Sequence, residues 1–143
     1  MIDRAVELLS KGEYTVVAIT TSNEVITGNG TSVRPLFEIV EKKQEALSGG
    51  AVADKVIGKA AACLLCRSKV SSVFAYIMSE PALKLLNKYK ISVSYEKLVK
   101  AIMNRKGTDL CPMEKTVADI EDIDECFEKI KEFIKSTPPP KRI

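Results

Sequence analysis

Five polar side chains follow apolar segments at the points where strands are expected to end: Arg34, Asp54, Lys55, Lys59 and Ser79. In an open α/β sheet, ligands bind beyond the carboxyl ends of the strands, where free amides at helix starts favour an anion. Lys55 and Lys59 are four residues apart, so on a helix they would share one face. The pattern predicts a site for a nucleotide or phosphorylated metabolite. In the alternative interpretation, Asp54 and Ser79 only cap helices and the cations are solvated.

Cys111 is a second candidate for chemistry. It precedes Pro112 in a pattern typical of a helix start, where the positive end of the helix dipole lowers a thiol pKa. Arg105 lies in the same loop and is assigned to the anion site. Because the chain contains no histidine, Asp54 or Glu114 would have to move the proton of a catalytic thiol. The alternative is a buried, unreactive thiol.

Cys63 and Cys66 have the C-x-x-C spacing of zinc and redox sites. They lie inside an apolar helical pattern, and the other two cysteines, Cys111 and Cys126, are distant in sequence. Core packing is therefore the expected role of this pair. The sequence predicts no bound metal and no other cofactor.

The composition argues against several classes of function. The chain has 143 residues, of which 45% are hydrophobic and 29% charged, and its net charge is +3. Because this charge is small and interleaved, we do not expect a nucleic-acid partner. No apolar segment approaches the ~20 residues that span a bilayer, so we expect no membrane partner. Without histidine there is no Ser-His or Cys-His pair and no imidazole metal ligand.

The length fits one domain, which we place at residues 1–135. Residues 136–143 contain three consecutive prolines and are predicted to form a flexible tail. The first residues begin a helical pattern rather than a signal peptide, and four cysteines suit a reducing compartment. A cytoplasmic location is therefore expected.

Hydrophobic periodicity predicts strands that alternate with helices. The expected strands are residues 14–19, 24–26, 51–53, 73–78 and 91–95, with the first two in a hairpin. The expected helices are residues 2–11, 34–47, 56–66, 80–88 and 95–104, and two more begin near residues 111 and 122. This order predicts a three-layer α-β-α sandwich with a mixed sheet of about five strands.

Several segments also carry a resemblance to a known family. They are residues 33–36, 53–62, 78–79, 94–96, 104–107 and 111–114. In these segments the chain resembles the DUF1893 family, a domain of unknown function within the cytidine-deaminase-like superfamily. The resemblance implies a deaminase-like fold over most of the chain, and it implies no activity.

The true deaminases of that superfamily hold zinc with motifs at two helix starts. The second helix begins with His-x-Glu or Cys-x-Glu, and the third with Pro-Cys-x-x-Cys. Here the corresponding starts are Arg34-Pro35 and Asp54-Lys55-Val56-Ile57. Zinc-dependent deamination is therefore not expected.

The leading hypothesis is a single domain that binds a small anionic ligand where the second and third helices begin. One alternative is a cysteine-dependent enzyme that uses Cys111. Another is a non-catalytic regulatory or interaction module that acts through a sheet edge or as a homo-oligomer. The sequence leaves open whether the protein is an enzyme.

Overall fold

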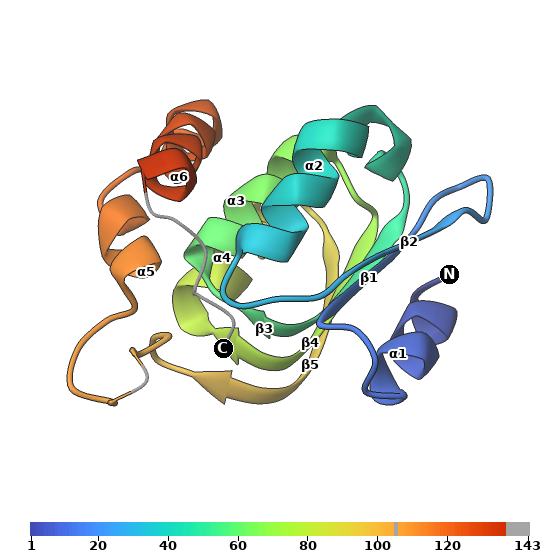
Figure 1. Cartoon of the computed structure of the whole chain (residues 1–143), viewed down its shortest axis with the longest axis horizontal. Helices are drawn as coiled ribbons and strands as arrows, with labels where there is room; N and C mark the ends of the chain where they lie inside the picture. The colour runs from blue at the N-terminus through green and yellow to red at the C-terminus, as the bar shows by residue number, and fades with distance from the viewer. Residues whose placement is uncertain (105, 137–143) are drawn as a thin grey trace.

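The computed structural model describes residues 1–104 and 106–136. Helices cover both faces of a central five-stranded sheet, in three layers (Figure 1). The predicted role of Arg105 lies outside the described residues, and so does the tail predicted at residues 136–143, apart from Ser136, which is the last residue of a helix.

The sheet consists of β1 (Val16–Ile19), β2 (Val25–Gly28), β3 (Ala51–Ile57), β4 (Ser72–Ser79) and β5 (Ser92–Val99). Its spatial order is β2-β1-β3-β4-β5. β1 is antiparallel to both β2 and β3, whereas β3, β4 and β5 are parallel. The predicted hairpin and the predicted mixed five-stranded sheet are therefore confirmed.

The described helices are α1 (Ile2–Ser10), α2 (Arg34–Leu47), α3 (Lys59–Ser68), α4 (Glu80–Lys88), α5 (Pro112–Val117) and α6 (Ile123–Ser136). The main core lies between the sheet and helices α2 to α6, while α1 packs on the opposite face (Figure 1). α3 is central because its alanines, leucines and cysteines are almost entirely buried and let α2, α4 and α6 approach closely.

Two segments predicted as helix are strand instead. β3 continues through Asp54 to Ile57, because Val56 pairs with Ile77 and Ile57 with Met78 of the parallel neighbour β4. In the same way β5 continues to Val99, so the helix predicted over residues 95–104 is wrong. In both segments β-branched residues and strand pairing outweigh an apolar spacing that also fitted a helix.

Two predicted helix caps are confirmed. The hydroxyl of Ser79 accepts a hydrogen bond from the amide of Ala82 at 3.2 Å. Asp122 accepts from the amides of Asp124 at 2.8 Å and Glu125 at 3.3 Å. These caps fix where α4 and α6 begin.

Among the described residues, no helix has the length and apolarity needed to cross a membrane.

Candidate functional site

The segment before α2 and the start of α3 line one cavity of about 670 Å³ at the carboxyl end of β3, which we call the β3 pocket. The segment before α2 contributes Thr31, Ser32 and Val33, and β3 contributes Asp54, Lys55 and Val56. The beginning of α3 adds a third wall, and the loop before α5 a fourth. The sheet topology thus brings together the two helix starts that the sequence analysis singled out.

Asp54 is a buried carboxyl group in this pocket rather than a helix cap. It lies within β3, and only 9% of its surface is exposed to solvent. Its carboxylate accepts a hydrogen bond from the amide of Lys55 at 2.7 Å. Burial raises the pKa of Asp54 to about 7, although hydrogen bonds from the backbone of Lys55 and Val56 oppose the shift. A carboxyl group that titrates near neutrality inside a cavity can exchange protons with a ligand.

Lys55 and Lys59 do not share a helix face, and that prediction is wrong. Lys55 belongs to β3, is exposed and lines the β3 pocket. Lys59 begins α3, and its ammonium group donates a hydrogen bond to the carbonyl of Ala118 at 2.9 Å. The strand that extends through Ile57 separates the two lysines into different cavities.

Glu114 occupies the amino end of α3. Its Oε1 accepts from the amide of Lys59 at 2.7 Å, and its Oε2 accepts from the amide of Ala60 at 3.1 Å. Burial raises the pKa of Glu114, and these two hydrogen bonds oppose the shift. The amides that the sequence analysis assigned to a bound anion therefore already hold a carboxylate of the protein itself.

Gly58 makes this contact sterically feasible. A Cβ atom at Gly58 would overlap the carboxylate of Glu114 and also crowd Ile102. Sequence reasoning considered Glu114 as a proton carrier for Cys111 and as an acidic residue in the first turn of its own helix, but not as the cap of α3. It missed the cap because Glu114 lies 55 residues beyond Lys59, and no local pattern links the two.

Cys111 also lines the β3 pocket, together with Asp54 and Glu114. It is the residue before α5, is half-buried, and its amide donates to the carbonyl of Ile102 at 3.0 Å. Cys111 and the two acidic residues considered for its chemistry therefore line one cavity.

Arg34 and Ser79 do not join them. Arg34 is half-buried at the start of α2 and is not among the described residues that line the pocket. Ser79 is fully buried and its hydroxyl caps α4. Of the predicted binding residues that the structure describes, Asp54 and Lys55 therefore line the β3 pocket together, and the others do not.

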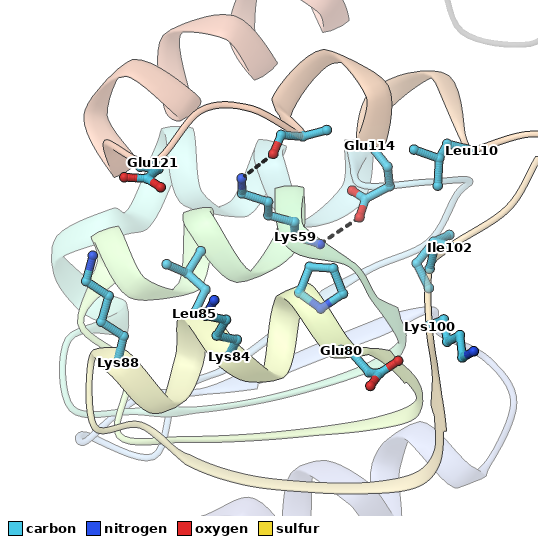
Figure 2. A pocket seen from close by; sticks show the side chains of 13 residues that line it. Lys59, Glu80, Lys84, Leu85, Lys88, Lys100, Ile102, Leu110, Glu114 and Glu121 are labelled. Atoms are coloured by element: carbon cyan, nitrogen blue, oxygen red, sulfur yellow. Dashed lines mark hydrogen bonds between the residues drawn. The ribbon is translucent and has the colours of Figure 1, made fainter.

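A second cavity of about 620 Å³ lies between α4, α5 and the chain that follows β5, and we call it the lysine pocket (Figure 2). Its cationic members are Lys59, Lys84, Lys88 and Lys100. Glu114 and Ile102 line both cavities and separate them. Sequence reasoning missed this cavity because its lysines come from three separate segments.

The cysteines of the C-x-x-C pair are buried and free, as is Cys126. A hydrogen bond with Cys126, together with burial, raises the pKa of Cys63, and burial raises the pKa of Cys66 to about 12. Such thiols remain protonated at neutral pH. Within residues 1–104 and 106–136, no three His, Cys, Asp or Glu side chains are grouped so that they could hold a metal ion.

Comparison with known proteins places the chain in a family. No curated protein is significantly similar to it. One solved structure is a deaminase/reductase of Thermotoga maritima, diaminohydroxyphosphoribosylaminopyrimidine deaminase/5-amino-6-(5-phosphoribosylamino)uracil reductase. It is 17% identical, with 80% of this chain and 39% of that chain covered and a TM-score of 0.46. A similarity at this level does not establish a shared activity.

The crystal structure of a DUF1893 family protein from Thermotoga maritima is far more similar. It has a TM-score of 0.84 and 28% identity, with 92% of this chain and 88% of that chain covered. The model of the family described as a domain of unknown function, DUF1893, matches residues 4–134. The chain therefore belongs to the DUF1893 family.

Proposed function

We propose that the β3 pocket binds a small anionic molecule, a nucleotide or a phosphorylated metabolite. The observation that carries this proposal is that Lys55 and the residues leading into α2, Thr31 to Val33, line the same cavity. The first turn of a helix attracts negative charge, and a lysine ammonium group adds a full positive charge. Since Glu114 occupies the start of α3, the anion belongs at the α2 side of the cavity.

The size and lining of the pocket suit a ligand with an apolar part as well. Its volume of about 670 Å³ lies within the range of small-molecule sites. Val56 and Met103 line it and keep 41% and 45% of their surfaces exposed. A nucleotide base placed against them would remove this surface from water.

The protonation state of Asp54 would then determine whether a bound ligand meets a neutral or a negatively charged carboxyl group. With a pKa of about 7, it is largely protonated in mildly acidic solution and can donate a hydrogen bond to an anion. Above that pH its negative charge would oppose the anion. The proposal therefore includes tighter binding of anions on the acidic side of neutrality.

The substitution Lys55→Gln should weaken the binding of AMP about tenfold, because it removes one charge-assisted hydrogen bond. Isothermal titration calorimetry measures the dissociation constant. Lys97→Gln is the matched control, since Lys97 is also an exposed lysine in a strand but does not line the β3 pocket. Equal affinities of the two variants for AMP would refute the role of Lys55.

A second candidate function is thiol chemistry at Cys111, favoured by the placement of Cys111, Asp54 and Glu114 around one cavity. Either carboxyl group would accept the thiol proton, so that the thiolate attacks an electrophilic carbon of a ligand and displaces its leaving group, as it displaces iodide from iodoacetamide. Iodoacetamide labelling at neutral pH should modify Cys111 faster than free cysteine, and the buried Cys63, Cys66 and Cys126 far more slowly. A rate at Cys111 no greater than that of free cysteine would eliminate this function.

A further inference from the structure

The lysine pocket combines four positive charges with an apolar wall. Lys84 and Lys88 lie one turn apart on α4, Lys59 lies at the start of α3, and Lys100 follows β5 (Figure 2). Leu85 extends from α4 beside the two lysines of that helix, and Ile102 and Leu110 line the opposite side (Figure 2). Of these residues, Ile102 also lines the β3 pocket, and the others do not.

Within the described part of the chain, the four lysines of this pocket take part in no ion pair. The ion pairs found there involve Lys43, Arg67, Lys115 and Lys129, and none of the four pocket lysines. Lys59 is held by an uncharged partner, the carbonyl of Ala118. Three glutamates line the pocket, and one of them, Glu114, is already bound to the amides of α3.

The spacing of Lys84 and Lys88 is unfavourable for the helix itself. Like charges four residues apart on a helix repel each other and destabilise it. Both ammonium groups lie on the pocket side of α4, with Leu85 between them in sequence (Figure 2). An anion bound between the lysines would remove this repulsion, and an apolar body attached to it would cover Leu85.

We propose that the lysine pocket is a second ligand site, which binds an apolar molecule with one anionic group, such as an organic carboxylate or sulfonate. The anionic group binds Lys84 and Lys88. The apolar part lies along Leu85 toward Ile102 and Leu110. The cavity volume of about 620 Å³ accommodates a ligand of this kind.

The fluorescent dye anilinonaphthalene sulfonate is a suitable probe, because it joins an aromatic body to one sulfonate. The double variant Lys84→Gln/Lys88→Gln should bind it about tenfold more weakly than the wild type does. Lys11→Gln/Lys42→Gln makes the same change in net charge at exposed lysines that line neither cavity, and it should bind as the wild type does. Decanoate should displace the dye, whereas decanol at the same concentration should not.

Lys55→Gln separates this proposal from the one for the β3 pocket. It should leave binding of the dye unchanged while it weakens binding of AMP. The second site is refuted if wild-type protein fails to bind the dye, if both double variants bind it equally, or if Lys55→Gln alone removes the binding. Thermal unfolding of each variant verifies that the exposed substitutions leave the fold intact.

Discussion

The substitution Asp54→Asn should stabilise the protein by about 4 kcal/mol at about pH 8. Burial raises the pKa of Asp54 from 3.8 to about 7 in the folded state. One pKa unit corresponds to about 1.4 kcal/mol, so ionising this buried carboxyl group costs several times that amount. Asparagine carries no charge and keeps the oxygen that accepts from the amide of Lys55 at 2.7 Å.

The sign of the pH dependence follows from the raised pKa. Between about pH 4 and pH 7 the folded state binds more protons at Asp54 than the unfolded state does, so wild-type stability falls as the pH rises. The full contribution is present below the unfolded pKa and is lost as the pH rises through about 7. The difference between Asp54→Asn and wild type should therefore be small near pH 4 and largest above pH 7.

Urea denaturation across this pH range measures the effect. Asp119→Asn is the matched control, because Asp119 is exposed and its substitution should change stability by less than about 0.5 kcal/mol at every pH. An Asp54→Asn protein that is less stable than wild type above pH 7 would contradict the burial of an ionisable carboxyl group in β3.

The substitution Glu114→Ala should destabilise the protein by about 3 kcal/mol. It leaves the amides of Lys59 and Ala60 without partners at the amino end of the central helix, and each unsatisfied buried donor costs about 1–3 kcal/mol. It also removes a negative charge from the positive end of α3. Chemical denaturation gives the change in the free energy of unfolding.

Two further variants show whether the cap causes this loss. Glu121→Ala removes an exposed glutamate of the lysine pocket and should change stability by less than about 0.5 kcal/mol. Gly58→Ala keeps Glu114 but places a methyl group where its carboxylate lies, so it should destabilise the protein as well. If Glu114→Ala were as stable as Glu121→Ala, the helix cap would be ruled out.

The architecture could be predicted from sequence because its signals are local. The turn residues between β1 and β2, the Ser79 and Asp122 caps, and the alternation of strands and helices each depend on neighbouring residues. The ends of β3 and β5 could not be predicted in this way. Their final residues fit a helical spacing, and pairing with β4 decides the outcome across long sequence separations.

The sequence indicated some of the residues that share a cavity, but not how they contact one another. The rule that ligands bind beyond the carboxyl ends of strands drew attention to Asp54 and Lys55, which line one cavity with the segment before α2. The same rule could not show that Glu114 caps α3, because that contact joins residues 55 apart. Nor could it show the lysine pocket, since Lys84 and Lys88 have the spacing of an ordinary solvated helix face.

The central claim is that the β3 pocket is where the protein holds an anion, and the most direct test is an NMR titration of isotope-labelled protein with AMP. We expect the largest amide shifts at Thr31 to Val33 and at Asp54 to Val56, which line that pocket. Lys55→Gln should reduce these shifts and Lys97→Gln should not. Shifts confined to other surfaces, or none at saturating AMP, would contradict the claim.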